Sequence, residues 1–256
     1  MVKGLEVFRK YFADSEDQYV IIGGAACDIH IQAAELTPRA TKDIDMILVV
    51  EALSAEFVLQ FWNFIVDGRY ERNENGEEER KYYRFLKPAN EEFPVQVELF
   101  SRNPDLLDPD ERVYLTPVPT PDDLSSLSAI LLDDAYYHLV IDRSEIVNEI
   151  HWASIETLIC LKAKAYIDIL RRIEEGSNED KKLLGKHKGD VFRLGILLAE
   201  SDVYILPNQV SEDLKEFLGI IRDDLPDKAI FKEMGVNVAP DDVFSQIKSS
   251  LLPEAV

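Results

Sequence analysis

Apolar and polar positions in the first part of the chain predict alternating strands and helices. Residues 19–22 and 43–50 are rich in β-branched side chains and predict two strands. Residues 25–36, between them, contain helix formers at helical spacing and predict a helix. A second amphipathic helix is expected over residues 54–66, with Ser54 as its N-terminal cap.

Strand patterns then continue. Residues 69–72 and 81–86 flank a charged, glycine-containing segment and predict a hairpin, while residues 94–100 alternate as a strand does. Two further apolar runs, residues 128–134 and 135–142, are interpreted as strands that extend the sheet. The first of these runs could equally be a short helix.

The last part of the chain has a helical pattern. Ser154 is expected to cap the first helix and Gly176 to end it, and Pro240 falls in the first turn of the last helix. The expected helices cover residues 154–176, 186–200, 211–225 and 239–252. We therefore expect an α+β fold with two domains, residues 1–150 with a mixed sheet and flanking helices and residues 151–256 all helical.

Composition narrows the class of protein. The chain has 256 residues, with 28 Lys and Arg against 49 Asp and Glu, and a formal charge of −21. A field of that sign repels nucleic-acid backbones, so general DNA binding is not expected, whereas a cationic substrate, a metal-bound nucleotide or a basic protein fits. Cys27 and Cys160 lack further ligands at suitable spacing, which argues against a disulfide or structural zinc. Because no apolar run could span a membrane and no signal peptide is recognisable, we expect a cytoplasmic protein without membrane contact.

Three carboxylates form the most informative pattern. Residues two apart in a strand face the same side, so Asp43 and Asp45 point together, with backbones roughly 6 to 7 Å apart. Their repulsion favours a cation between them, and Mg²⁺ prefers carboxylate oxygens, water and substrate phosphate. If the strand of Glu98 lies beside them in register, the three acids could hold two ions about 3.5 to 4 Å apart. The alternative is that Glu98 is a surface residue on an edge strand.

Gly23 and Gly24 are the second part of the pattern, a candidate phosphate-binding turn. Because glycine has no Cβ, the pair allows a sharp turn from strand to helix and brings backbone N–H groups close to an anion. The positive end of the helix dipole adds to this attraction. The glycines are therefore expected to hold the phosphates of a nucleoside triphosphate whose metal ions are held by the acids.

This order of motifs resembles the nucleotidyltransferase superfamily that includes DNA polymerase beta, whose members share a Gly-Gly or Gly-Ser turn, a helix, an Asp-x-Asp strand and a later third carboxylate. Within it, residues 19–200 look most like the AbiEii-type, abortive-infection toxin nucleotidyltransferases. The resemblance implies the nucleotidyltransferase fold, followed by an all-α domain. It also implies two Mg²⁺ ions as cofactors and an NTP as substrate. The chain departs from the family in its longer segment between Gly24 and Asp43, and in Gly24 itself, where many members have serine.

The resemblance assigns further residues to the site. Arg39 and Thr41 belong to an Arg-x-[Ser/Thr]-x-Asp-Ile-Asp element typical of the family, and Arg39 would neutralise the acids or contact phosphate. A lysine on the first helix of the helical domain also recurs, here Lys162 or Lys164. Lysines two positions apart on a helix cannot both face one site, and we favour Lys162.

A Lys-x-x-Asp element near the next helix is also typical of the family. It corresponds to Lys186 or Lys188 with Asp190. Asp190 would orient Lys186 or a substrate group; alternatively, it is an ordinary helix acid paired with Arg193.

We therefore expect a Mg²⁺-dependent enzyme that transfers an NMP from an NTP to an acceptor hydroxyl. Asp43 and Asp45 would hold both ions, Glu98 would assist deprotonation of the acceptor, and Lys162 would stabilise phosphate charge. For a toxin-like enzyme the acceptor is RNA, tRNA in particular, or a protein side chain, and an antitoxin protein is a partner to look for. One alternative is a nucleotidyltransferase acting on a small molecule such as an aminoglycoside antibiotic; another is a non-catalytic module that binds nucleotide or a partner protein.

Overall fold

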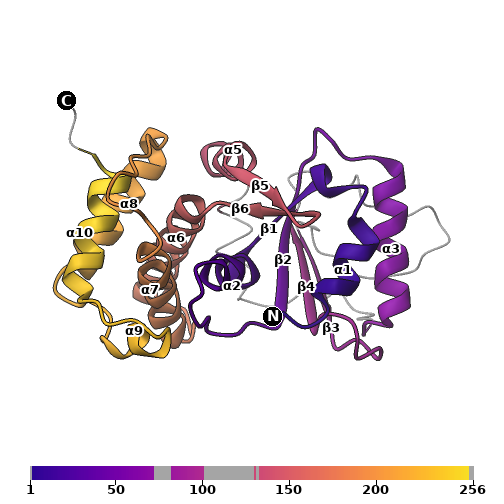
Figure 1. The fold of residues 1–256 in the computed structure, drawn as a ribbon, viewed down its shortest axis with the longest axis horizontal. Helices are drawn as coiled ribbons and strands as arrows, with labels where there is room; N and C mark the ends of the chain where they lie inside the picture. Colours follow the sequence, from indigo (N-terminus) through magenta and orange to yellow (C-terminus); the bar gives the residue numbers. More distant parts are fainter. Residues whose placement is uncertain (1, 72–81, 101–129, 131–132, 254–256) are drawn as a thin grey trace. The chain divides into compact units, whose positions relative to one another are not determined.

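The computed structural model describes residues 2–71, 82–100, 130 and 133–253, and Figure 1 follows the chain through them. The chain forms two compact units. The first comprises Met1–Asp28, Ala40–Pro121 and Ile141–Ala153, and the second comprises Ile29–Arg39, Asp122–Val140 and Ser154–Val256. Two segments of the predicted first domain thus group with the helical part, and the division at residue 150 stays a prediction.

A mixed six-stranded sheet is the centre of the first unit in the part of the chain that the structure describes. Its strands are β1 (Tyr19–Ile22), β2 (Asp43–Leu48), β3 (Tyr82–Leu86), β4 (Gln96–Phe100), β5 (Ser144–Val147) and β6 (Ile150–Ala153). Their order across the sheet is β3-β4-β2-β1-β6-β5. β1 is antiparallel to β2 and parallel to β6, β2 is parallel to β4, and both outer pairs are antiparallel. The fold is α+β, as the sequence pattern predicts.

The two central strands are the ones with the strongest sequence signal. β1 is buried along its whole length, and β2 is buried except at Asp43 and Asp45, which are partly exposed. Strands covered on both faces read as continuous apolar runs, which is why residues 19–22 and 43–50 were recognisable. The two aspartates are therefore exceptions on an otherwise buried strand.

Aromatic side chains attach the helices of the first unit to the sheet. These helices are α1 (Leu5–Phe12), the single-turn η1 (Glu16–Gln18) and α3 (Ala55–Gly68), and α2 (Gly23–Ala33) begins there. α1 and α3 lie side by side (Figure 1), and the ring of Phe8 is 5.8 Å from that of Phe64 and 5.3 Å from that of Tyr19. On β3, the Phe85 ring lies 5.7 Å from Phe61 of α3. Such edge-to-face pairs add to the stabilisation from buried area.

The cap expected for α3 is present. Ser54 Oγ accepts a hydrogen bond from Phe57 N at 3.1 Å, so the hydroxyl satisfies one of the free N–H groups at the start of the helix. α1 was not anticipated from the sequence pattern. Its buried residues Leu5, Phe8 and Phe12 recur at helical spacing, which was the available signal.

Helices make up the second unit within the described residues. They are α5 (Asp134–Asp142), which continues into the first unit, α6 (Ile155–Glu174), α7 (Lys182–Gly195), α8 (Asn208–Ile221), α9 (Ala229–Glu233) and α10 (Pro240–Leu251). α6 packs against α7 and α8, and α10 also packs against both. Pro240 opens α10 as expected, and Gly176 follows α6 with φ of 99°, a conformation that favours glycine. The Ser154 hydroxyl donates to Thr157 Oγ1 at 3.0 Å instead of accepting from a backbone N–H.

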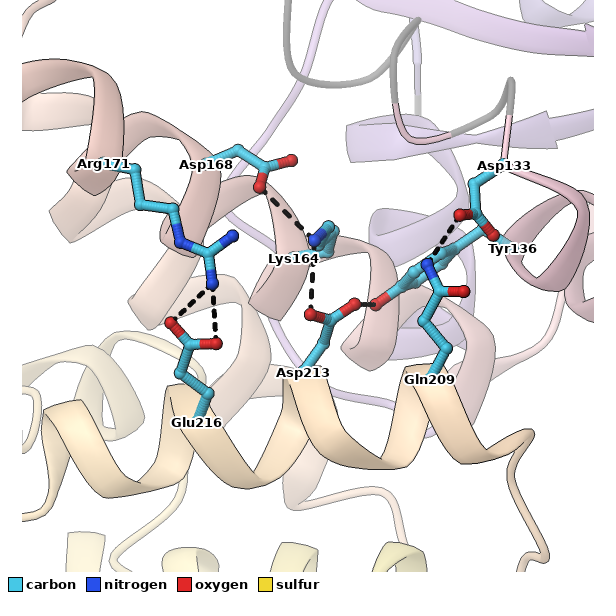
Figure 2. A network of polar contacts seen from close by, with 8 residues as sticks. All are labelled: Asp133, Tyr136, Lys164, Asp168, Arg171, Gln209, Asp213 and Glu216. Carbon is cyan, nitrogen blue, oxygen red and sulfur yellow. Dashed lines mark hydrogen bonds and ion pairs between the residues drawn. The ribbon is translucent and has the colours of Figure 1, made fainter. Parts of the chain in front are cut away.

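Polar contacts join α8 to α5 and α6, as Figure 2 shows. Tyr136 Oη of α5 donates to Asp213 Oδ2 at 2.9 Å, and Lys164 Nζ of α6 donates to Asp213 Oδ1 at 3.2 Å. Nearby on α8, Glu216 accepts two hydrogen bonds from Arg171 Nη2, at 2.8 and 2.7 Å. Asp213 is therefore a shared anchor for three helices.

The strand expected over residues 135–142 is wrong, because this run belongs to α5. Tyr136, Tyr137, Leu139 and Val140 are buried at a spacing that suits one face of a helix. The run at residues 128–134 lies largely outside the described residues. The strands that complete the sheet at that side, β5 and β6, were not anticipated.

The hairpin expected over residues 69–86 is described only at its two ends. Glu71 N donates to Leu86 O at 3.0 Å, and residues 72–81, where the turn is expected, lie outside the described residues. The ladder partner of β3 is β4, and the strands expected over residues 81–86 and 94–100 are confirmed.

None of the helices among the described residues is long and apolar enough to cross a membrane.

Candidate functional site

The three predicted carboxylates lie on neighbouring strands in register. β2 and β4 run parallel, with Asp45 opposite Glu98 and Asp43 opposite Gln96. Residues that lie directly opposite on adjacent strands, about 4.8 Å apart, project from the same face of a sheet. Asp43, Asp45 and Glu98 therefore share one face. The surface alternative for Glu98 is wrong, because its side chain is only 12% exposed and β4 is an interior strand.

The environment of Glu98 raises its pKa to about 7. Burial is the largest cause, the negative charge of Asp45 raises the pKa further, Arg84 lowers it, and Asp43 adds a smaller rise. Arg84 Nε lies 2.5 Å from Glu98 Oε1, and Gln96 Nε2 donates to the same oxygen at 2.7 Å. A carboxyl group with a pKa near neutrality can both accept and release a proton under physiological conditions.

Gly23 begins α2 directly beside Asp45. Its φ of 68° lies in the left-handed region that glycine adopts readily, and a Cβ at this position would overlap the Asp45 carboxylate. Gly24 is less crowded, although a Cβ there would still lie only 2.8 Å from Thr41 Oγ1. The expected turn from strand to helix is confirmed, and it brings both glycines against residues of the predicted site.

Asp28 of α2 links that helix to the segment that enters β2. The residue is buried, and its Oδ2 accepts a hydrogen bond from Thr41 N at 2.8 Å. Thr41 lies two residues before Asp43, so the bond positions the start of the acidic strand. Sequence reasoning missed this residue, although an acid inside the apolar segment Ala-Ala-Cys-Asp-Ile was a usable signal.

The chemistry of the acidic cluster fits a divalent cation in part. Asp43 and Asp45 offer the carboxylate oxygens that Mg²⁺ prefers, and repulsion among the acids contributes to the raised pKa of Glu98. Among the described residues, however, no three His, Cys, Asp or Glu side chains converge as metal ligands. Within this cluster Glu98 forms an ion pair with Arg84. Asp43 and Asp45 would hold a cation directly, and Glu98 would join them after leaving Arg84.

A separate cluster in the second unit is centred on Asp190 of α7. Asp190 Oδ1 lies 3.3 Å from both Arg39 Nε and Arg193 Nη1, and Oδ2 lies 3.5 Å from Lys162 Nζ. Burial by itself raises the pKa of Asp190, but the charges of Lys162, Arg39 and Arg193 outweigh it and hold the pKa below its usual value. Asp190 thus pairs with Arg193, as one alternative proposed, and also contacts Arg39 and Lys162 of the predicted set.

The two alternative lysines of α6 have different partners. Lys162 is buried and faces Asp190 of α7. Lys164 lies 3.2 Å from Asp213 and 3.5 Å from Asp168, in the network that joins α6 to α8 (Figure 2). Both lysines are therefore paired with aspartates, and the preference for Lys162 stays a prediction.

His187 lies on α7 between the two alternative lysines of that helix. Lys188 Nζ donates to Asp224 Oδ2 at 2.7 Å, whereas Lys186 is exposed. Burial, followed by the charge of Lys162, lowers the pKa of His187 to about 3. The imidazole is therefore neutral at physiological pH, and its Nδ1 has no hydrogen-bond partner among the described residues.

Sequence reasoning also missed Arg84, which the antiparallel ladder of β3 and β4 places opposite Glu98. A charged residue inside the apolar run Tyr-Tyr-Arg-Phe-Leu was its only signal in the sequence. That signal did not identify a partner, because the pairing of β3 with β4 is a tertiary contact.

A scan against protein-family models gives no match, and neither does a comparison with the curated proteins. We therefore infer function from the arrangement of the described side chains.

Proposed function

We propose that the protein is a Mg²⁺-dependent nucleotidyltransferase that transfers an NMP from an NTP to an acceptor hydroxyl and releases pyrophosphate. The observation that carries this proposal is the register of β2 and β4, which places Asp43, Asp45 and Glu98 on one face of the sheet. Gly23 adds to it, because the turn at the start of α2 adjoins Asp45. Three acids on one face of two largely buried strands repel one another unless a cation or a proton neutralises part of their charge.

In the proposed reaction, the acceptor oxygen bonds to the α-phosphorus while the bond from that phosphorus to the bridging β-phosphate oxygen breaks. Asp43 and Asp45 would hold the two Mg²⁺ ions, and the bound ions would supply positive charge to neutralise the phosphates. Glu98 would join them at the ion nearest the acceptor hydroxyl and assist removal of the hydroxyl proton, a role supported by its place opposite Asp45. Pyrophosphate carries away the remaining phosphate charge.

Two further groups have binding roles in the proposal. The backbone N–H groups at the start of α2 hold the phosphates of the NTP, helped by the helix dipole. Lys162 stabilises phosphate charge, a role that the family resemblance implies and that its burial beside Asp190 does not by itself require. The contacts of Asp190 with Lys162 and Arg39 would keep these two side chains oriented.

The proposed acceptor is RNA, tRNA in particular, or a protein side chain, as in toxin-like nucleotidyltransferases, for which an antitoxin would be a partner. A cationic small molecule such as an aminoglycoside is the second acceptor class that we propose, because the net charge of −21 attracts cations and repels nucleic-acid backbones. The competing function is a module that binds nucleotide or a partner protein without chemistry.

Transfer of label from each α-³²P-NTP, with Mg²⁺, tests these functions together. The acceptor pools are total tRNA, a host protein extract and an aminoglycoside panel. We expect label in one acceptor class. The rate of labelling should fall roughly a thousandfold or more in Asp43→Asn/Asp45→Asn, because this variant lacks the carboxylates that would hold the Mg²⁺ ions against the phosphates. Asp241→Asn/Asp242→Asn, which changes the net charge equally in the first turn of α10, should keep full activity.

The acceptor pool that carries label identifies the substrate class. Absence of label from every pool, together with NTP binding that the Asp43→Asn/Asp45→Asn variant retains, would contradict the enzyme and support the binding module.

A further inference from the structure

Arg84, Glu98 and Asp45 form a row across three neighbouring strands. β3 pairs antiparallel with β4 and places Arg84 opposite Glu98, and β4 pairs parallel with β2 and places Glu98 opposite Asp45. Directly opposite residues project from the same face of the sheet. A positive charge on the edge strand therefore ends the row of acids.

The pair of Arg84 and Glu98 is close and shielded from water. Arg84 Nε lies 2.5 Å from Glu98 Oε1, and the two side chains are 19% and 12% exposed. A shielded ion pair is screened less than a surface pair, so the attraction between the guanidinium and the carboxylate is strong here. Gln96 Nε2 holds the same oxygen at 2.7 Å. Glu98 is thus held by residues of its own and the edge strand.

We infer that Arg84 is an internal counter-ion, which holds Glu98 in the cation-free protein and releases it when a divalent cation binds Asp43 and Asp45. The inference rests on the proposed function, because it takes a divalent cation as the ligand of the acids. Arg84 is a positioning residue that acts through Glu98. The exchange keeps a positive charge beside the buried glutamate in both states, and this avoids the penalty of an unpaired buried charge.

This arrangement has a measurable consequence for cation affinity. In the wild type, the pair of Arg84 and Glu98 competes with the cation for the carboxylate and must break before Glu98 can become a ligand. Removal of the guanidinium removes both the competition and the repulsion between two like charges. The protein without this arginine should therefore bind a divalent cation more tightly.

Calorimetric titration with Mn²⁺ at mildly alkaline pH, without nucleotide, measures this affinity. We expect Arg84→Met to lower the dissociation constant about tenfold or more. Arg84→Lys, which keeps a positive charge opposite Glu98, should stay within about threefold of the wild type. The matched control is Arg9→Met, because Arg9 also pairs with a glutamate of the first unit, Glu6 at 2.7 Å, outside the acidic row. It should leave the affinity unchanged.

A second measurement covers the case in which Arg84→Met does not fold. In wild-type protein with ¹⁵N-labelled arginine, the Arg84 Nε–H signal, assigned by its loss in Arg84→Lys, should move when Mg²⁺ is added. The same titration of Asp43→Asn/Asp45→Asn should leave the signal in place. A merely structural arginine would not respond in either protein.

Unchanged Mn²⁺ affinity in Arg84→Met, or a stationary Nε–H signal in a wild type that binds Mg²⁺, would overturn the inference while the proposed enzyme could still transfer label. Tighter Mn²⁺ binding in a protein that labels no acceptor would support the inference and count against the enzyme. Absence of cation binding in both wild type and Arg84→Met would overturn both.

Discussion

At the scale of single residues, the acidic cluster follows from the two-residue period of a strand. Asp43 and Asp45 were expected to share a face, and their partial exposure on a buried strand agrees with this. The residues that tune the cluster were not recognisable in the same way. Arg84 acts on Glu98 from another strand and Asp28 acts on Thr41 from a helix, so their roles depend on contacts rather than on local pattern.

His187 leads to a prediction about stability and pH. Its pKa is lowered to about 3 in the folded protein, against an ordinary value of 6.5, so the unfolded chain binds a proton below pH 6.5 that the folded chain excludes. Stability from this residue is therefore lost as pH falls below 6.5. Between pH 7 and pH 5, His187→Gln should lose about 2 kcal/mol less free energy of unfolding than the wild type.

Urea unfolding of both proteins at the two pH values measures this difference. The control is His138→Gln, which makes the same substitution at a histidine that is exposed on α5. Equal losses in His187→Gln and the wild type would show that the imidazole is protonated in the fold, against the charges of Lys162, Lys186 and Arg39 that surround it.

At the scale of elements, the sequence pattern was most informative where a run was long or fully buried. Helices α6, α7, α8 and α10 and strands β1, β2 and β4 were recognisable, because their apolar positions repeat at a helical period or form continuous runs. Residues 135–142 were misread because eight apolar and polar residues suit a short strand or a short helix. The buried face of α5 is decided by what it packs against.

Asp213 should contribute more to stability than its neighbour Glu216 on the same helix. Asp213 accepts hydrogen bonds from buried Tyr136 and from Lys164, so Asp213→Ala removes two bonds and leaves a buried hydroxyl unsatisfied. We expect a loss of about 1 to 3 kcal/mol in the free energy of unfolding. Glu216→Ala, the matched control, removes a more exposed pair with Arg171 and should cost no more than about 1 kcal/mol.

Denaturant unfolding of the two variants compares these costs directly. Equal losses would mean that the shared contacts of Asp213 in Figure 2 carry no more stability than a surface ion pair. A larger loss in Glu216→Ala would contradict the assignment of Asp213 as the anchor of α8.

At the scale of the whole molecule, the net charge of −21 governs the response to salt. Repulsion among an excess of acids destabilises any compact state, and added salt screens it over a Debye length that falls to about 3 Å at 1 M. The Tm should therefore rise by several degrees, on the order of 5 °C, between low salt and about 0.5 M NaCl. Thermal scans in NaCl and KCl should agree, because screening depends on ionic strength. A fall in Tm with salt would show that specific ion pairs outweigh the net repulsion.

The sequence by itself determined the α+β class, the main strands and helices, the glycine turn and the common direction of Asp43 and Asp45. These features depend on the period of apolar residues, on turn residues and on side-chain alternation, which act within a few positions along the chain. They are local properties, so a single sequence is enough to recognise them.

Only the tertiary structure decided that Glu98 is opposite Asp45, that Arg84 is opposite Glu98, and that Lys162, Arg39 and Arg193 gather around Asp190. Strand order and helix packing bring together residues that are far apart in the sequence. Burial then sets how strongly their charges act on one another, since the pKa of each group depends on neighbours that local pattern does not reveal.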